Sequence, residues 1–333
     1  MKRSHRIRGI GLLLFILFAL WVAGPTISSE RALAAEKVRL SMGGSNTGTF
    51  IYMFSATLAD IWKRYIPEYD ITVMATPGST ANYLPIEKGE MDLGAAATFG
   101  DWWAIHGMYF TKQKLVNFCS MLPASKAFSH AFTYMDSPIK TWKDMDGKVV
   151  HLGARASPTS IVNEEIFKVL GIKGKYVYST PQEAVDMVKD KRVEAMVYSV
   201  GAPWGSIMDI ATDRPIKLIP LKPEEQKKIA DTLPYQVADV IPAKTYAFQN
   251  EDYQTVMGLQ NIVVRPTLSD EIVYKLTKVA LEHWDEVVKA SSGAKWVKAA
   301  DIVNMIAPVH PGAVKYYREI GIKIPESLVW KKK

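Results

Sequence analysis

Strand-like and amphipathic helical runs alternate along most of this 333-residue chain. Apolar runs at 38–43, 71–76 and 92–98 predict strands. Residues 50–65 have helical periodicity, and a turn at 77–79 opens a second helix toward Gly89. This β-α-β-α-β order predicts an α/β fold with mostly parallel strands. Open sheets of this kind bind ligands beyond the carboxyl ends of their strands, which directs attention to the loops there.

The same rhythm returns after a turn-rich passage at 135–148. Residues 148–154 predict a strand, 157–172 a helix and 193–199 another buried strand. About 300 residues remain once the N-terminal segment is set aside, which is more than one hydrophobic core usually serves. We therefore expect two α/β lobes with a ligand cleft between them.

The segment from Ile241 onward lacks this rhythm and is predicted to be mainly helical. Amphipathic runs at 269–290 and 314–320 carry that prediction. We expect the tail to pack back on the first lobe. Lobe 1 would then comprise residues 35–127 together with 241–333, including the C-terminal helices, and lobe 2 residues 128–240.

The N-terminus has the three parts of a secretory signal peptide. Four basic residues precede an apolar run at 10–24, and Ala32-Leu33-Ala34 supplies a small-x-small cleavage site. The apolar run is shorter than the roughly 20 residues that a membrane span needs. We expect residues 1–34 to be a signal peptide cleaved near Ala34 and the mature chain to work in the periplasm.

Charge and cysteine content exclude several classes of protein. The formal net charge of +7 falls to +3 once the five basic and one acidic residues of the signal peptide are removed. A mildly basic chain with scattered lysines is not typical of nucleic-acid binding, and no nucleic-acid partner is expected. Cys119 is the only cysteine, so an intramolecular disulfide and a cysteine zinc cluster are both excluded. We interpret it as a small buried apolar side chain.

The loop GGSNTGT, residues 43–49, lies between the first strand and the first helix. It lacks the Gly-Lys-Ser/Thr ending of a P-loop and the third glycine of a dinucleotide-binding loop. Two interpretations stay open. Small residues at a helix start leave amides that favour an anion, or Thr47 or Thr49 caps the helix and nothing more.

Further polar and aromatic residues lie near the expected strand ends. Ser157 and Pro158 have the order of an N-cap and first helical position. Arg155 offers a fork of donors suited to a carboxylate, or is simply a surface residue. Aromatic residues such as Trp204 close the pocket or belong to the core.

Five stretches together resemble one family, the TAXI solute receptors that serve certain TRAP transporters. They cover nearly the whole mature chain: SNTGTFIYMFSATLADIW, PGSTANYLPIEKGEMDLG, GKVVHLGARASPTS, VEAMVYSVGAPWGSIMDIA and APVHPGAVKYYREIGI. Each motif alone is weak, whereas their order and spacing are specific. The resemblance implies a type II periplasmic binding protein-like fold and binding without catalysis.

The resemblance also implies that ligand contacts lie in the loops at the strand ends. Thr47 and Gly48 match the family's first loop, Gly78, Ser79 and Asn82 the second, and Ser157 and Thr159 the third. Together with the neighbouring polar and aromatic candidates, the predicted ligand-binding residues are Ser45, Asn46, Thr47, Gly48, Tyr52, Gly78, Ser79, Asn82, Thr98, Arg155, Ser157, Thr159, Tyr198 and Trp204.

This chain departs from the family pattern within those loops. Thr49 replaces a glycine, Ile51 a common tyrosine, and Pro158 an inner glycine, so that an amide donor is lost. Ala97-Thr98-Phe99 replaces a Gln-Ser-Asp-like stretch. We therefore expect a small carboxylate first, then an amino acid such as glutamate, then a larger aromatic or sulfonated acid.

The family's C-terminal His-Pro-Gly-Ala signature is present at His310. A metal site would need further ligands at close spacing, and none is near in the sequence. A catalytic role would need a nucleophile and an orienting group. We interpret His310 as structural, locking the tail onto the body of the protein.

Three classes of function remain. The first is a TRAP receptor that captures a small organic anion by lobe closure and delivers it to a membrane permease, commonly one fused protein. The second is a receptor for an ABC importer or a sensor. The third, a secreted hydrolase, is disfavoured because no Gly-x-Ser-x-Gly or His-Glu-x-x-His motif occurs. We expect a monomer that is not an enzyme and uses no cofactor or metal.

Overall fold

The computed structural model describes residues 37–47 and 49–332. The predicted signal peptide and Gly48 lie outside these residues. The strands are β1 (Val38–Ser45), β2 (Tyr69–Ala75), β3 (Leu93–Ala97), β4 (Cys119–Tyr134), β5 (Val149–His151), β6 (Lys175–Val177), β7 (Ala195–Val200), β8 (Ile216–Leu218), β9 (Val237–Ile241) and β10 (Tyr253–Val264). The α-helices are α1 (Phe50–Tyr65), α2 (Tyr83–Glu87), α3 (Thr98–His106), α4 (Pro158–Leu170), α5 (Pro181–Lys189), α6 (Gly205–Asp213), α7 (Pro223–Thr232), α8 (Asp270–Glu282), α9 (Trp284–Ala290) and α10 (Pro311–Glu319).

The described strands form one mixed sheet in the order β2-β1-β3-β10-β4-β7-β5-β6, with β8 paired to β4 and β9 to β10. Neighbours among β1, β2 and β3 are parallel, as are those among β5, β6 and β7. Every pair that includes β4 or β10 is antiparallel. The expectation of mostly parallel strands was therefore wrong, because two central antiparallel strands join the parallel groups.

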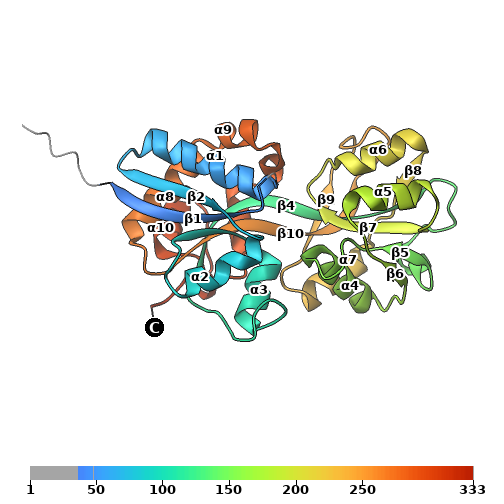
Figure 1. The fold of residues 1–333 in the computed structure, drawn as a ribbon, viewed down its shortest axis with the longest axis horizontal. Coiled ribbons are helices and arrows are strands. Elements are labelled where there is room, and N and C mark those ends of the chain that lie inside the picture. Colours follow the sequence, from blue (N-terminus) through green and yellow to red (C-terminus); the bar gives the residue numbers. More distant parts are fainter. Residues whose placement is uncertain (1–36, 48, 333) are drawn as a thin grey trace, which may run out of the picture. The chain divides into compact units, whose positions relative to one another are not determined.

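Strands β4 and β10 lie side by side and connect the two groups of parallel strands (Figure 1). The first part of β4 pairs with the end of β10, where Cys119 lies opposite Val264. The last part of β4, from Phe128 to Phe132, pairs with β7. At 3.2–3.4 Å per residue, the 16 residues of β4 extend for about 50 Å. They therefore run through both halves of the sheet.

Helix α1 illustrates why the local signals in the sequence succeed. Thr49 is its N-cap, and the Thr49 hydroxyl accepts a hydrogen bond from the Tyr52 amide. Phe54, Leu58 and Trp62 return to one face at helical spacing, and all three are buried. The helix covers β1 and β2 (Figure 1). The predicted bounds, 50–65, are confirmed.

Helix α4 begins as its sequence indicates. Ser157 is the N-cap and its Oγ accepts a hydrogen bond from the Ser160 amide at 3.2 Å. Pro158 occupies the first helical position, where no intrahelical amide bond is lost. The helix ends at Gly171, whose φ of 68° is left-handed and suits glycine. Both predicted features of this helix start are confirmed.

The segment after Ile241 is mainly helical as expected, except that its first element is the long strand β10. The prediction failed there since Gly258, Gln260 and Asn261 interrupt the apolar run YQTVMGLQNIVV. The remainder is helical, from α8 to α10. Cys119 is fully buried as expected, and burial raises the pKa of its thiol.

His310 is a structural lock in the described chain. It is 1% exposed and is the N-cap of α10, where its Nδ1 accepts a hydrogen bond from the Gly312 amide at 3.1 Å. Its own amide donates to the Ser120 carbonyl, and the Ser120 amide donates to the Pro308 carbonyl. The tail is thereby attached to the start of β4. Burial lowers the pKa of His310 and favours the neutral ring.

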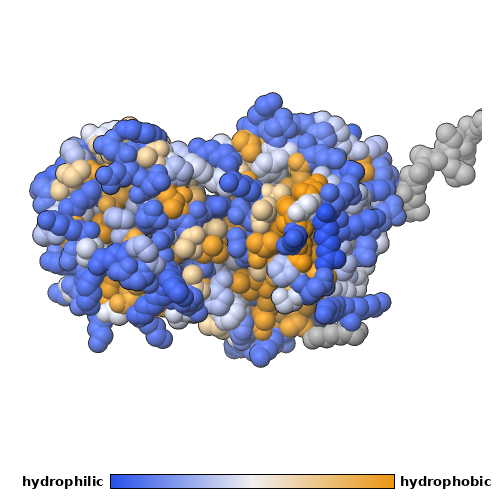
Figure 2. Space-filling model, turned by 180° about the vertical axis from the view of Figure 1, so that it is seen from behind, coloured by the Kyte–Doolittle hydropathy of each residue, from blue (hydrophilic) through white to orange (hydrophobic). Residues whose placement is uncertain are grey.

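No helix among the described residues is both long and apolar enough to span a bilayer. On the face shown in Figure 2, hydrophobic surface alternates with hydrophilic residues.

The lobe boundaries expected from the sequence stay a prediction.

Candidate functional site

A cavity of about 340 Å³ lies where the predicted loops meet. It is lined by Ser45, Asn46, Pro77, Gly78, Ser79, Thr80, Ala97, Phe99, Ala127, Pro158, Thr159, Val162, Ser199, Gln236, Gly258, Leu259 and Gln260. None of these described lining residues is charged. Hydroxyl and carboxamide groups supply most of the polarity, and the volume is within the range typical of small-molecule sites.

The first wall consists of the loops that follow β1 and β2. Asn46 Nδ2 donates to the Pro77 carbonyl at 3.1 Å, and the Thr76 amide donates to the Ser45 carbonyl at 3.0 Å. Ser45 has a φ of 145°, which a side-chain-bearing residue rarely adopts. The cross-links between the loops hold it in this conformation. The two loops therefore form one edge that presents Ser45 and Ser79 to the cavity.

The opposite wall consists of the start of α4 and the end of β7. Thr159 is in the first turn of α4, whose leading amides have no partner within the helix. Ser199 Oγ donates to Asn163 Oδ1 at 2.9 Å. Asn163 in turn donates to the carbonyls of Leu152 and Val197. These bonds fix α4 against the sheet, and Thr159 is thereby held at the cavity wall.

Gln236 is a lining residue that the sequence analysis missed. Its side chain is 4% exposed, and its Oε1 has no hydrogen-bond partner among the described residues. It lies just before β9 in the segment PYQV, where no motif or periodicity distinguishes it. Nothing in the sequence could have singled it out.

Thr98 is buried next to the lining residues Gln236 and Leu259 and connects their backbones. It is 1% exposed, its hydroxyl donates to the Tyr235 carbonyl, and it accepts a hydrogen bond from the Leu259 amide, both at 3.1 Å. Thr98 is not a lining residue, although it was predicted to bind ligand. It instead connects the residues next to Gln236 and Gly258.

A second cavity of about 420 Å³ adjoins the first, and the two share Ala127, Ser199 and Gln260 in their linings. Lys126, Lys295 and Trp204 line this second cavity. Lys126 is largely buried, and its Nζ lies 2.8 Å from Asp239 and 3.7 Å from Asp301. Its charge is therefore compensated within the chain, whereas Lys295 lies with its ammonium over the Trp296 ring at 4.8 Å.

Trp204 is held by a buried chain of polar groups. Its amide donates to the Tyr246 hydroxyl at 3.0 Å, which lies 2.8 Å from His130 Nε2. His130 Nδ1 lies 2.9 Å from the Phe128 carbonyl, which can only accept, so Nδ1 carries the hydrogen and Nε2 accepts from Tyr246. Burial lowers the pKa of His130 to about 4 and keeps the ring neutral. Every member of the chain thereby has a partner.

The structure brings five of the predicted residues to the first cavity and one to the second. Ser45, Asn46, Gly78, Ser79 and Thr159 line the first, and Trp204 lines the second. The roles of all these residues in binding stay a prediction, since no ligand defines the contacts.

The other predicted residues lie elsewhere. Asn82 is buried, and its Nδ2 donates hydrogen bonds to the carbonyls of Gly43 and Ala95. Arg155 is exposed and covers the Tyr178 ring at 4.4 Å. Tyr198 stacks on Trp204, with 4.7 Å between ring centroids. The three remaining described residues, none of them in either lining, are Thr47, Tyr52 and Ser157.

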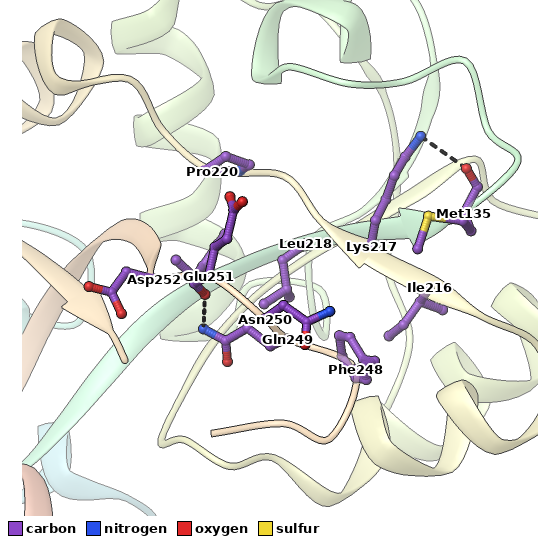
Figure 3. Close-up of a pocket in the computed structure, with 11 residues that line it drawn as sticks. Met135, Ile216, Lys217, Leu218, Pro220, Phe248, Gln249, Asn250, Glu251 and Asp252 are labelled. Carbon is purple, nitrogen blue, oxygen red and sulfur yellow. Dashed lines mark hydrogen bonds between the residues drawn. The ribbon is translucent and has the colours of Figure 1, made fainter. Parts of the chain in front are cut away.

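The cavity in Figure 3 is larger, at about 530 Å³, and lies between β8 and the segment that leads into β10. Lys217 Nζ donates to the carbonyls of Met135 and Ser137, and Gln249 Nε2 donates to those of Ile241 and Glu251. The buried polar atoms without a partner in the described chain are all elsewhere. The Lys217 and Gln249 side chains are therefore bonded within the chain, and the smaller cavity, where the predicted loops meet, is the better candidate.

Within the described residues, no group of three or more His, Cys, Asp or Glu side chains could hold a metal ion. The candidate site therefore consists of neutral hydrogen-bonding groups, with two lysines in the adjoining cavity. Such a site can bind a small polar solute.

Two parallel groups of strands joined by long antiparallel strands define the two-lobed fold of periplasmic binding proteins. A TctC solute-binding protein from Polaromonas has this fold, with a TM-score of 0.56 and 13% identity over 78% of this chain and 88% of that chain. The aliphatic sulphonate-binding protein SsuA from Escherichia coli matches more loosely, with a TM-score of 0.46 and 13% identity over 88% and 97% of the two chains.

A family model identifies the chain more closely. The model of the NMT1-like family matches residues 42–321, and the chain belongs to this family. The match includes all the described residues that line the first cavity.

Proposed function

We propose that this protein is an extracytoplasmic solute-binding receptor that captures a small organic anion for a membrane transporter. The observation that carries the proposal is the cavity of about 340 Å³, because its lining combines residues of both predicted lobes. Ser45 and Ser79 belong to predicted lobe 1, and Thr159 and Gln236 to predicted lobe 2. The fold shared with a solute-binding protein supports the same function.

An anion can be held in this cavity without a charged partner. Hydroxyl groups of Ser79 and Thr159 are hydrogen-bond donors, and the first two residues of α4, Pro158 and Thr159, line the cavity. The amides and dipole of a helix N-terminus stabilise negative charge. Arg155, which was expected to provide a positive charge, is not part of the lining. Neutral donors are therefore proposed to bind the anion.

Closure of the lobes is supported by a clasp beside the cavity. Glu165 on α4 accepts hydrogen bonds from the hydroxyls of Tyr109, at 2.9 Å, and Tyr235. Tyr109 belongs to predicted lobe 1, whereas Glu165 and Tyr235 belong to predicted lobe 2. Burial and the bond to Glu165 raise the pKa of Tyr109 to about 12, so its hydroxyl stays a donor at neutral pH. The clasp favours a closed arrangement over an open one.

The transporter that we propose as the partner is a TRAP system of the TAXI type. The proposal rests on the order of the five sequence stretches, from the first loop to His310. Uptake would then be driven by an ion gradient and not by ATP. The test is uptake of the bound solute into vesicles that contain a candidate TRAP permease and the purified receptor. An ATP requirement would assign the receptor to an ABC importer instead.

The binding function is tested on the mature chain with isothermal titration calorimetry. We expect one small carboxylate to bind with a stoichiometry of one, and Thr159→Val and Ser79→Ala to weaken binding at least threefold each. Ser206→Ala, at the start of α6, is the control because Ser206 is not part of either cavity lining. Equal affinities in the parent and the three variants would show that the anion does not bind in this cavity.

A further inference from the structure

A second cavity continues the first along the central strands. The cavities, of about 340 and 420 Å³, share Ala127 on β4 and Gln260 on β10 in their linings. Gly258, opposite Ala127, also lines the first cavity, and Ser125, opposite Gln260, also lines the second. Side chains two positions apart on a strand lie on the same face of the sheet. One face of β4 and β10 therefore forms a wall that is common to both cavities.

Gln260 has an unused hydrogen-bond donor where the two cavities meet. Its Oε1 accepts a hydrogen bond from the Ser125 hydroxyl at 2.7 Å, which fixes the orientation of the carboxamide. No described residue accepts a hydrogen bond from its Nε2, and Nε2 is not one of the fully buried atoms without a partner. The two hydrogens of Nε2 are therefore accessible to a bound molecule. An oxygen atom of a ligand that passes from one cavity to the other is a suitable acceptor.

The charges of the second cavity do not favour a second anionic group on the ligand. Lys126 Nζ lies 2.8 Å from Asp239, so this ammonium already has an anionic partner. Lys295 is exposed to solvent, where screening weakens ion pairs, and its ammonium lies over the Trp296 ring at 4.8 Å. A second carboxylate would therefore gain little from either lysine. The apolar part of the lining remains available for recognition.

Trp204 and Phe50 form an aromatic wall of the second cavity. Trp204 is half-buried, its amide donates to the Tyr246 hydroxyl at 3.0 Å, and its ring stacks on Tyr198 with 4.7 Å between centroids. Phe50 is in close contact with Gly293, where a Cβ would lie 2.7 Å from the Phe50 ring. Both rings are therefore held in position before a ligand binds. Another aromatic ring packs favourably on such a wall, in an offset-stacked or edge-to-face arrangement.

We propose that the ligand is an organic anion with an aromatic group and that it extends through both cavities. Its carboxylate lies in the first cavity, Gln260 Nε2 donates to an oxygen of the ligand where the cavities meet, and the aromatic group packs on Trp204. This inference rests on the proposed function, and it specifies the ligand class. Aromatic acids, third in the order expected from the sequence, thereby become the favoured class.

The test compares carboxylates that share one chain and differ at its end. Phenylacetate, 3-phenylpropionate and 4-phenylbutyrate first show which chain length fits. Calorimetry on the mature chain should then show that the phenyl acid binds at least about tenfold tighter than the unsubstituted acid of that length, because the ring buries additional apolar surface. The phenyl acid should also bind tighter than the corresponding dicarboxylate, since Lys126 is paired and Lys295 is exposed.

Substitution of Trp204 shows whether its ring contacts the ligand. The phenyl acid is compared with the cyclohexyl acid of the same chain length, which has a similar size and no π system. In Trp204→Leu, the ratio of the two affinities should shift about threefold toward the cyclohexyl acid. A ratio measured within one variant is not changed by a general loss of stability. Trp102→Leu, on α3 outside both cavities, is the matched control and should keep the parent ratio.

Substitution of Gln260 tests the place where the cavities meet. Gln260→Glu keeps an oxygen that accepts from Ser125 and replaces Nε2 with a negatively charged oxygen. The phenyl acid should therefore bind at least about threefold more weakly, because a donor is lost and like charges repel. Gln254→Glu, on β10 outside both cavities, is the matched control and should bind the acid as the parent does.

The outcomes separate the two proposals. If none of the acids binds, the proposed function as a small-anion receptor is wrong. If acids bind and the unsubstituted acid or the dicarboxylate is preferred, the extension of the ligand onto the aromatic wall is overturned and the receptor function stands. An unchanged affinity ratio in Trp204→Leu, or an unchanged affinity in Gln260→Glu, would overturn it in the same way.

Discussion

Asp101 on α3 gives this protein a pH dependence that one substitution should remove. Its carboxyl group is fully buried, and burial raises its pKa from 3.8 to about 7. Hydrogen bonds from Tyr83 and Asn261, at 2.7 and 3.1 Å, oppose that rise without cancelling it. At neutral pH, a large part of the Asp101 population is therefore protonated in the folded protein.

The sign of the effect follows from the two pKa values. Because the folded-state pKa is the higher one, Asp101 contributes its full stability below about pH 3.8 and loses it as the pH rises to about 7. At about 1.4 kcal/mol per pH unit, the difference amounts to about 4 kcal/mol. Asp101→Asn cannot ionise, so its free energy of unfolding should rise by about this amount relative to the parent between pH 4 and pH 8.

The assay is urea denaturation of the mature parent and the Asp101→Asn variant at several pH values, followed by tryptophan fluorescence. The loss of acceptor capacity in the variant shifts its stability equally at every pH, whereas the ionisation effect changes with pH. Asp70→Asn, at an exposed position on β2, is the control for removal of a carboxylate. A gap between Asp101→Asn and the parent that stays constant within about 1 kcal/mol from pH 4 to pH 8 would refute the reasoning.

Three further substitutions test other parts of the structure. Gly312→Ala would place a Cβ 2.3 Å from the Asp270 carbonyl oxygen. We therefore expect urea denaturation to show a loss of about 1–3 kcal/mol in the free energy of unfolding. An unchanged midpoint would contradict the close packing of α10 on α8. Tyr246→Phe leaves His130 Nε2 and the Trp204 amide without their partner, and should also cost about 1–3 kcal/mol; a loss below about 0.5 kcal/mol would mean that the chain of polar groups does not form. Tyr109→Phe should weaken ligand binding about two- to fivefold in calorimetry, because its bond to Glu165 is part of the proposed clasp. Stability should stay nearly constant, because Tyr109 is half exposed. Equal affinity would exclude the clasp.

The elements that the sequence predicted are those with local signals. The bounds of α1 follow from Thr49 and the spacing of Phe54 and Leu58, which are features of one short segment. The start of α4 follows from Ser157 and Pro158 in the same way. Each signal depends on neighbours within a few residues, so the rest of the fold was not needed to interpret it.

The two central strands were not predicted, because their polar residues are satisfied only after distant pairing. Ser125 on β4 donates to Gln260 Oε1 on β10 at 2.7 Å, and Thr255 on β10 donates to the Ser129 carbonyl on β4 at 2.6 Å. Considered alone, these residues interrupt an apolar run and favour a loop. In the paired strands they cost little, since each buried group has a partner more than 100 residues away.

The candidate site shows the same limit of prediction from sequence. Asn82 matches a family motif and was expected to offer its amide to a ligand, yet its two amide hydrogens are donated to Gly43 and Ala95. Gln236 matches no motif, and its Oε1 accepts no hydrogen bond from the described residues. Which side chain recognises a ligand therefore depends on the hydrogen-bonding capacity that folding leaves unused, and only the folded chain reveals that capacity.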